Sequence, residues 1–538
     1  MAKVTKPPPP DRLTMRLFGP GMSLLHRAGL GGLACTLRAM ESQFPKGECP
    51  WLIEPQAVTL LFEDPAKAGE YLKRLFAFAF AIGKADGLIR LPGQYLTEPS
   101  AAVLADLQAG LTLTFLQHGQ VRQLAKEPST VSYDPMGDGV PLIVKYHKCS
   151  GFKHQDGWEA FGERDGTLTR GQLKVDGPLN PGAVVRHRAF TGDTVAKDPP
   201  ERMLPLYFAL VGCISLPVNR GVAALLVPEV EDLTVFIEDR PSLTPTTARE
   251  CQIANTTDAV LQAQLRIRSR KMAKGLDVPG CYAMTFRPTV WASQLKSRVG
   301  TVHVPRVPSD DKMLDRFQRA LDRLPTRVKS RTITEHTGKG KSKRTTERQE
   351  SFRVDSIVRP LVADNLALGR RWYTGFSNLM TKNNPATDKP YRASLPFERK
   401  GLHDMISDTM MWDEAGERLV VQAVHEAISR RLGQIRGETD GESSKPLSQA
   451  TKNRWERFRE KLRLDLAGAK TEAQLRFALT DLFSRGGSNS VLREHWAAVL
   501  PVIRKDWQLA RDLGLLALAS YAGRGTNDAT VIPDTTQE

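Results

Sequence analysis

The chain has 538 residues, of which 41% are hydrophobic and 25% are charged, a composition typical of globular proteins. This composition excludes a wholly disordered, collagen-like or coiled-coil protein, and the length predicts roughly two to four domains. Lys and Arg total 76 against 60 Asp and Glu, giving a formal net charge of +16. Such an excess favours a polyanionic partner, most often nucleic acid, and a basic but otherwise ordinary cytosolic enzyme is the alternative.

No membrane or export role is expected. The longest apolar run, Leu204 to Val218, contains two prolines and is shorter than the roughly 20 residues of a spanning helix. The N-terminal stretch has a proline run but lacks the apolar core of a signal peptide, so we expect a cytoplasmic protein. The six cysteines include no C-x-x-C pair, and His147, Cys149 and His154 are the only close grouping of metal-ligand types. We expect neither a metal site nor a cofactor.

Residues 1–145 predict an α+β region. A glycine-rich entry is followed by apolar residues at helical spacing, namely Leu30, Leu33, Leu37 and Met40. Val58–Phe62 is typical of a strand, and residues 68–83 of an amphipathic or buried helix. The elements alternate without the rhythm of a parallel sheet, which favours α+β over a doubly wound fold.

Residues 146–400 predict a central region rich in strands, turns and loops. The stretch 222–239 is expected to form two strands interrupted at Pro228 and Glu229. A helix is predicted over 258–274, and we take its cations as candidate nucleic-acid contacts: Arg266, Arg268, Arg270, Lys271 and Lys274.

A basic linker is predicted at 327–353 within this central region. The stretch has nine Lys or Arg against three Glu and almost no bulky apolar residue, so we expect an exposed loop or flexible arm. The composition of this stretch is compatible with two interpretations, a solvated linker and a segment that contacts nucleic acid. The candidate contacts here are Lys339, Lys341, Lys343 and Arg344.

Residues 401–523 predict an all-helical bundle, followed by a polar tail at 524–538. Apolar residues at helical spacing mark helices around 419–432, 455–466 and 475–482, and 499–521 predicts a final helix or pair of helices. One helix is strongly basic, and its candidate phosphate contacts are Lys452, Arg454, Arg457, Arg459 and Lys461. The spacing of Trp455 and Phe458 favours core positions over base-stacking platforms.

Each catalytic motif that we sought lacks a key residue. A Walker A loop ending at Ser342 would need Gly where Glu335 stands, and a dinucleotide-binding loop would need Gly at Ala34. Ser429 replaces the second histidine of a zinc-protease helix. The pairs Asp310–Asp311 and His403–Asp404 fit turns or helix caps better than a metal nuclease. We therefore expect no catalytic residue and no enzyme.

Three stretches resemble the large subunit of type I CRISPR Cascade complexes, in the myxan-type branch of the Cas eight family. They are HRAGLGGLACTLRAM with the later GLIRLPG, the central RGVAALLVPEVEDL, and the C-terminal RDLGLLALASYAGRG. They occur near the start, middle and end of the chain in the order of the family. The resemblance implies a multidomain α+β fold, with a mixed α/β N-terminal body and a C-terminal helical bundle similar to the small subunit.

The resemblance implies a non-catalytic role beside the 5′ handle of the CRISPR RNA. Such a subunit reads a short protospacer-adjacent motif on duplex DNA, helps to open the duplex, stabilises the R-loop and recruits the next effector. The implied partners are CRISPR RNA, the target double-stranded DNA with its displaced strand, the Cascade backbone, handle-binding and small subunits, and a helicase-nuclease or transposition effector. An internal start at Met405, Met410 or Met411 would supply a separate small subunit.

No base-contacting residue can be assigned by motif. Two loops rich in Gly, Lys, Asn or Gln are candidate motif readers, with the residues Lys145, Lys148, Lys153, Asn378, Lys382, Asn383 and Asn384. The alternatives are a metal-dependent DNA nuclease and a DNA-binding regulator that acts without a guide.

Overall fold

The computed structural model describes residues 8–45, 47–134, 141–175, 179, 181, 197–218, 221–289, 292–337, 344–384, 388–441 and 446–522. The chain forms two compact units: unit 1 is Met1–Leu314 with Thr326–Asp355, and unit 2 is Asp315–Pro325 with Ser356–Glu538. The divisions near 145 and 400 that the sequence suggests remain predictions. Among the described helices, none combines the length and apolar character that a membrane crossing requires.

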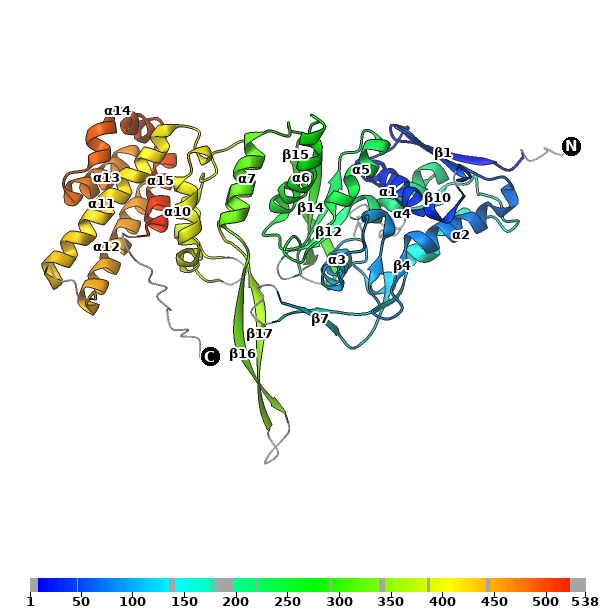
Figure 1. Ribbon diagram of the computed structural model, residues 1–538, viewed down its shortest axis with the longest axis horizontal. Helices are drawn as coiled ribbons and strands as arrows, with labels where there is room; N and C mark the ends of the chain where they lie inside the picture. The colour runs from blue at the N-terminus through cyan, green and yellow to red at the C-terminus, as the bar shows by residue number, and fades with distance from the viewer. Residues whose placement is uncertain are drawn as a thin grey trace, which may run out of the picture. The chain divides into compact units, whose positions relative to one another are not determined.

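Unit 1 mixes helices with small sheets, as expected for an α+β body (Figure 1). Its helices are α1 (Leu24–Met40), α2 (Ala68–Ala79), α3 (Ala101–Leu113), α4 (Pro200–Gly212), α5 (Leu233–Leu243) and α6 (Thr256–Ala273). One antiparallel sheet has the order β1-β3-β2, from Arg12–Arg16, Ala57–Leu61 and Trp51–Glu54. Another has the order β12-β13-β14-β15, from Ile214–Pro217, Ala223–Pro228, Cys281–Thr289 and Ala292–Val304.

Unit 1 contains further strands, of which β8 and β9 adjoin the predicted motif-reading loop. A four-stranded sheet has the order β16-β17-β8-β7, from Arg327–Thr337, Arg344–Val354, Leu142–Tyr146 and Ser129–Tyr133. Three two-stranded sheets pair β4 (Ala81–Ile82) with β5 (Ile89–Arg90), β6 (Arg122–Leu124) with β9 (Cys149–Phe152), and β10 (Leu173–Lys174) with β11 (Lys197–Asp198).

Unit 2 is helical. Its helices are α7 (Lys312–Arg323, of which Asp315 onward belongs to this unit), α8 (Arg359–Ala367), α9 (Phe376–Thr381), α10 (Arg399–Ser407), α11 (Ala415–Asp440), α12 (Gln449–Gly468), α13 (Glu472–Gly486), α14 (Ser490–Lys505) and α15 (Trp507–Ser520). The long helix α11 packs against α12, α13, α14 and α15. The expected helical bundle is confirmed, and its last segment is a pair of helices.

Two glycine-lined helices cross closely at the centre of unit 1. A Cβ atom on Gly29 of α1 would lie 1.9 Å from the Pro205 carbonyl oxygen of α4, and one on Gly32 would lie 2.3 Å from that of Phe208. A Cβ on Gly212 of α4 would lie 1.8 Å from the Ala28 carbonyl oxygen. The glycines of the N-terminal helix therefore allow backbone-to-backbone packing, and the prediction of a helix there is confirmed.

Residues 222–239 hold one strand rather than two. The first half is β13, as predicted, but the second half is α5. The Asp232 carboxylate caps this helix because its Oδ1 accepts from the amides of Thr234 and Val235 at 2.8 and 3.1 Å. The prediction of a second strand was wrong because Val, Ile and Phe favour strands, whereas the Asp cap decides the local structure.

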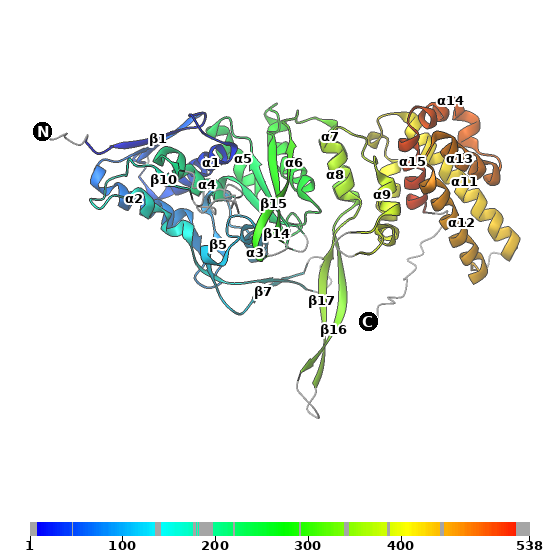
Figure 2. The ribbon, with the colours of Figure 1, turned by 180° about the vertical axis from the view of Figure 1, so that it is seen from behind.

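The predicted basic linker is a β-hairpin. β16 pairs with β17 over eleven positions, from Arg327 opposite Val354 to Thr337 opposite Arg344. The two strands extend away from the other elements of unit 1 (Figures 1 and 2). The prediction of a loop or flexible arm was wrong because it weighed charge alone, whereas Thr and other β-branched residues in both arms favour extended backbone.

Replacing Gly32 by Ala should destabilise the protein by about 2 kcal/mol or more, because a methyl group cannot enter the α1–α4 contact without moving the two backbones. Urea unfolding of the whole chain measures this. Gly162→Ala is the matched control in unit 1, since no atom lies within 4 Å of its added Cβ and its φ is −93°. Equal stability of the two variants would contradict the close crossing.

Candidate nucleic-acid interface

Three cations of the predicted cluster on α6 pair with α5. Lys271 and Asp239 form an ion pair of 2.5 Å whose side chains are only 6% and 8% exposed. Lys274 pairs with the Glu238 carboxylate, and Arg270 donates to the Glu238 carbonyl oxygen. Burial raises the pKa of Asp239, while Lys271 opposes this shift. These side chains fasten α6 to α5.

The other two cations of α6 donate to backbone carbonyls. Arg266 reaches the carbonyl oxygens of Ser242 and Leu243 at 3.2 and 2.8 Å, at the carboxyl end of α5. Arg268 donates to the Ser309 carbonyl oxygen at 2.6 Å. The whole cluster thus has contacts within the protein, and its role in nucleic-acid binding stays a prediction.

The basic hairpin and the predicted loop near Lys145 belong to one sheet. β17 pairs with β8 at Ser351 and Leu142, although these strands are about 200 residues apart in the chain. Arg353 fixes the same joint, since it donates to Asp106 on α3 at 2.8 Å and to the Tyr133 hydroxyl at 2.9 Å. Two basic segments that are far apart in the sequence therefore lie in one sheet.

An exposed aromatic ring lies between cations on the stem of the hairpin. Phe352 is 37% exposed, and the Arg331 guanidinium lies 5.4 Å from its ring centroid. Lys329 is its partner residue across the strands. Arg344 is the first residue of β17, whereas Lys339, Lys341 and Lys343 lie outside the described residues.

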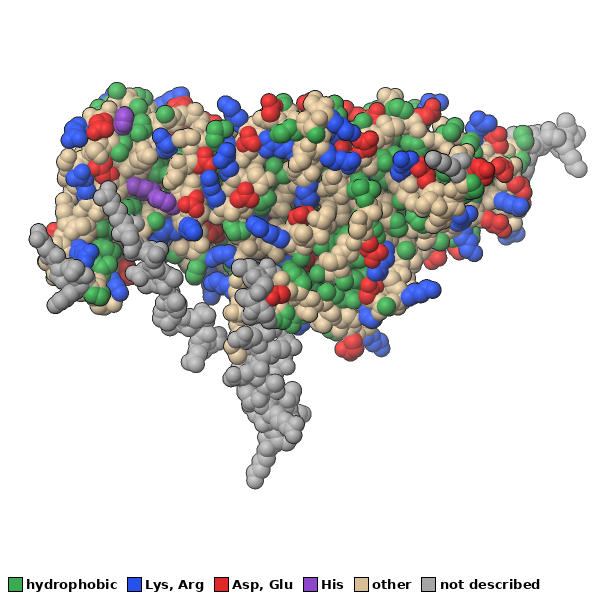
Figure 3. All heavy atoms as spheres, in the orientation of Figure 1, with side chains coloured by type: hydrophobic (Ala, Val, Ile, Leu, Met, Phe, Trp, Pro, Cys, Tyr) green, Lys and Arg blue, Asp and Glu red, His purple; other side chains and the backbone are tan. Residues whose placement is uncertain are grey.

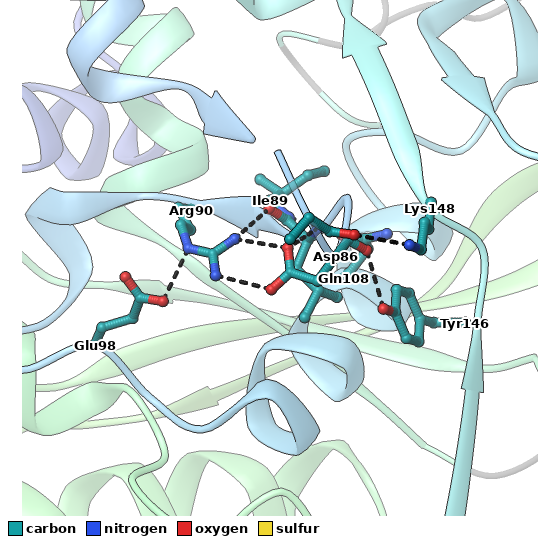
Figure 4. A network of polar contacts seen from close by, with 9 residues as sticks. Asp86, Ile89, Arg90, Glu98, Gln108, Tyr146 and Lys148 are labelled. Carbon is teal, nitrogen blue, oxygen red and sulfur yellow. Dashed lines mark hydrogen bonds and ion pairs between the residues drawn. The ribbon is translucent and has the colours of Figure 1, made fainter. Parts of the chain in front are cut away.

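Ion pairs among Asp86, Arg90 and Glu98 fix the turn between β4 and β5, which contacts the predicted loop (Figure 4). Arg90 makes two hydrogen bonds of 2.9 Å to the Asp86 carboxylate and one of 2.9 Å to Glu98. Asp86 also accepts from the Leu88 amide at 3.0 Å. Mainly because of Arg90, the pKa of Asp86 falls to about 2. The turn therefore carries a charge pair that persists over the neutral pH range.

The segment between β8 and β9 is fastened to this turn (Figure 4). Lys148 donates to the Ala85 carbonyl oxygen at 2.7 Å, and Tyr146 donates to that of Asp86 at 2.9 Å. Gly87 has a φ of +65°, and a Cβ there would lie 2.6 Å from that of Lys148. The loop that carries the candidate reader Lys148 is thus held in one conformation by the fold.

Exposed cations gather around this fastened loop. Lys145 and Lys153, both predicted, are exposed on β8 and at the start of the 3-10 helix Lys153–Phe161. Lys84 in the β4–β5 turn and Lys126 after β6 are also exposed. The sequence analysis missed these two because each is a single lysine outside any basic run, and only the fold gathers them.

The second candidate loop lies in unit 2, at the end of α9. Asn378, Lys382 and Asn383 are exposed, and the Asn384 amide donates to the Lys389 carbonyl oxygen at 2.8 Å. Asp512 of α15 holds the start of α9, accepting from the amides of Gly375 and Ser377 at 2.6 and 2.9 Å.

Helix α12 has both paired and unpaired cations. Arg454 donates to Glu438 at 2.6 Å and to Thr439 at 2.7 Å. Lys452, Arg457 and Lys461 are exposed, and no described residue pairs with their charges. Trp455 is half-buried and donates to the Leu432 carbonyl oxygen at 3.0 Å, so it anchors α12 on α11.

Cations on the face shown in Figure 3 do not form one continuous patch. On the face shown in Figure 3, Lys and Arg side chains alternate with Asp and Glu over both units. An interface must therefore be identified from local groups of cations.

The side chains of His147, Cys149 and His154 do not form a common site in the structure. His147 is exposed and bonds the Ala125 carbonyl oxygen, whereas His154 is fully buried among aromatic rings. Burial lowers the pKa of His154 to about 3, so this imidazole is neutral. Among the residues that the structure describes, no group of three His, Cys, Asp or Glu could hold a metal ion.

Two of the residues considered for a nuclease, Asp311 and His403, have structural contacts. Asp311 accepts from the Met313 amide at 2.7 Å, at the start of α7. His403 stacks on His425 with ring centroids 6.1 Å apart. His425 bonds the Ala517 carbonyl oxygen at 2.9 Å, and burial lowers its pKa to about 4.

Comparison with known proteins identifies the family. The model of the DevT N-terminal domain matches residues 14–207, and that of the DevT C-terminal domain matches 408–538. The chain is 34% identical to the CRISPR-associated protein Cas8a1/Csx13 of Myxococcus xanthus (strain DK1622), over 98% of this chain and 92% of that protein. The chain belongs to the Cas8 family. The expected membership of its myxan-type branch is confirmed, and the chain is a large subunit of the CRISPR Cascade defence system.

Replacing Asp86 by Asn should loosen the loop of this Cas8 chain. The pair with Arg90 stabilises the turn above pH 4, and its contribution is lost as the pH falls from the ordinary 3.8 of Asp to about 2. At neutral pH we expect faster hydrogen exchange at the Cys149 amide, which donates to the Gly87 carbonyl oxygen. Glu98→Gln, which removes only the outer and more exposed partner of Arg90, is the control and should change exchange little.

Proposed function

We propose that this Cas8 chain reads a short flanking motif on duplex DNA and helps to open the duplex. The observation that carries the proposal is the single sheet that joins the hairpin β16–β17 to β8 and the fastened loop. A two-stranded ribbon has the width that a major groove admits, and the lysines around the loop supply phosphate contacts. The membership of the Cas8 family supports the same role.

The contacts of Asp86 and Arg90 beneath the loop would help the loop to recognise the edges of DNA bases. Selection between bases requires donors and acceptors held in fixed positions, because a loose side chain contacts any base equally well. Asp86, Arg90 and Tyr146 hold the loop that carries Lys148, while Lys145 and Lys153 remain exposed. Lys145, Lys148 and Lys153 are therefore the proposed motif-side contacts in unit 1.

The helical unit is proposed to contact the displaced strand. Arg457 and Lys461 are exposed on α12 and have no partner among the described residues, so their charges are available to phosphates. Binding a guide-loaded complex and recruiting a helicase-nuclease or transposition effector complete the proposed role. The role requires no catalytic residue in this chain.

The decisive experiment measures binding of a duplex target by the guide-loaded Cascade backbone, with and without this chain. The base pairs that flank the protospacer are varied one at a time. We expect the chain to confer flank-dependent binding and strand opening. Binding that ignores the flank, or guide-independent cleavage of DNA by the chain, would overturn the proposal.

Neutralising Arg457 and Lys461 together by Gln should weaken binding to every target sequence. The slope of log affinity against log salt should fall by about 0.7 for each lost contact to a single strand. Arg454→Gln is the matched control on the same helix, since its charge already pairs with Glu438, and it should leave the slope nearly unchanged. Salt titrations of target binding measure the slopes, and equal slopes for the double variant and the unaltered chain would count against α12.

A further inference from the structure

An open hollow on unit 2 has a volume of about 640 Å³. This volume falls within the roughly 300–1,000 Å³ of pockets that hold small molecules. Its lining includes His403, His425, Glu426, Arg430, Ser490 and Tyr521. These residues come from α10, from α11, from the start of α14 and from the segment after α15. The fold thus brings together residues from four parts of the chain.

Three aromatic side chains of the hollow contact one another. The rings of His403 and His425 have centroids 6.1 Å apart and planes 15° apart, and the ring of Tyr521 lies 5.7 Å from that of His425. His403 is exposed, and histidine side chains adjoin each other on the face of unit 2 shown in Figure 3. Accessible rings of this kind favour a flat ligand that can stack on them.

The charges at the hollow are neutralised within the protein. Glu426 accepts from the Ser490 amide and hydroxyl at 3.0 and 2.8 Å and pairs with Arg430 at 2.8 Å. Burial opposes ionisation of Glu426, but these hydrogen bonds outweigh it and lower the pKa of Glu426 to about 2. The carboxylate would repel an anionic group, and a cationic group would compete with Arg430 for it. The hollow therefore suits an uncharged ligand group.

His425 has an unused hydrogen-bond acceptor. Its Nε2 donates to the Ala517 carbonyl oxygen at 2.9 Å, so this nitrogen carries the proton of the neutral ring. Burial lowers the pKa of His425 to about 4, which keeps the ring neutral at pH 7. Nδ1 is then an acceptor, and no described residue donates to it. The hollow therefore favours a ligand that carries an N–H group on its edge.

A nucleobase is flat and uncharged and has N–H groups on its edge, so it matches each of these properties. We propose that the hollow binds one unpaired base of the displaced strand, which stacks on His403 and Tyr521 and donates to Nδ1 of His425. The inference rests on the proposed contact of unit 2 with that strand. It adds a base-binding position to the phosphate contacts of α12, which packs on α11 and α15. A free nucleoside has the same chemistry, and the experiment separates the two sources.

The experiment compares two short single strands of equal length and charge. One strand is abasic throughout, and the other carries a single 2-aminopurine base, whose fluorescence falls when it stacks on an aromatic ring. Affinities of the full chain are measured for both strands and for free 2-aminopurine riboside. We expect the strand with the base to bind about tenfold more tightly than the abasic strand, with quenched fluorescence. Equal affinity for the two strands would overturn the proposal, and a riboside that binds as tightly as the strand would refute the strand contact.

Three variants test whether this preference for the base resides in the hollow. His403→Ala should abolish the preference and the quenching, whereas affinity for the abasic strand and its salt dependence should not change, because no phosphate contact is lost. His403→Tyr should retain the preference, because it keeps an aromatic ring. His495→Ala is the matched control, since His495 is exposed on α14 of the same unit and does not line the hollow. A preference that persists in His403→Ala would contradict the assignment.

The outcome is separable from that of the proposed function. A chain that prefers the base through His403, yet confers no flank dependence on the guide-loaded complex, would support the hollow and refute motif reading. Flank dependence in a chain without any preference for the base would refute the hollow alone. If His403→Ala leaves strand binding unchanged but weakens assembly with the guide-loaded backbone, the hollow binds a protein partner and the base contact is refuted.

Discussion

The crossing of α1 and α4 is the constraint on which unit 1 depends. Three glycines let the backbones touch, and this contact leaves the carbonyls at the end of α4 buried. The fully buried Arg240 of α5 satisfies them, donating to the carbonyl oxygens of Val211 and Cys213 at 2.7 and 2.8 Å. Burial lowers the pKa of Arg240 to about 10, so the group stays charged at neutral pH. One arginine thus joins α5 to a helix crossing that only glycine permits.

The proposed interface is built outward from this core. α3 packs on β12 and on β8, and its Asp106 receives Arg353 from the base of the hairpin. Asp106 is buried, and burial raises its pKa, so the carboxylate requires the arginine to remain charged. The hairpin is therefore fixed at its base by the same helix that supports β8.

Local patterns predicted most helices but not the hairpin or the function of individual cations. Helical spacing of apolar residues identified α1 and the bundle from α11 to α15, because such residues face the buried side of a helix. Charge counts cannot distinguish a paired cation from a free one. Lys271 lies 32 residues from its partner Asp239, and β8 lies about 200 residues from β17. The ion pair and the strand pairing both arise from the fold. The sequence analysis could therefore name the candidate contacts but could not tell which cations are available to nucleic acid.

The pairing of each cation gives a physical criterion for that ranking. A lysine or arginine that already has a carboxylate gains little from a phosphate, because binding must first break the internal pair. By this criterion Lys271 and Lys274 belong to the fold, whereas Arg457 and Lys461 are exposed and have charges that no described residue neutralises. Exposed cations without carboxylate partners keep their charges available to a polyanion, and binding of the polyanion then stabilises the folded chain. The net charge of +16 thus matters less for binding than where the fold leaves its cations without partners.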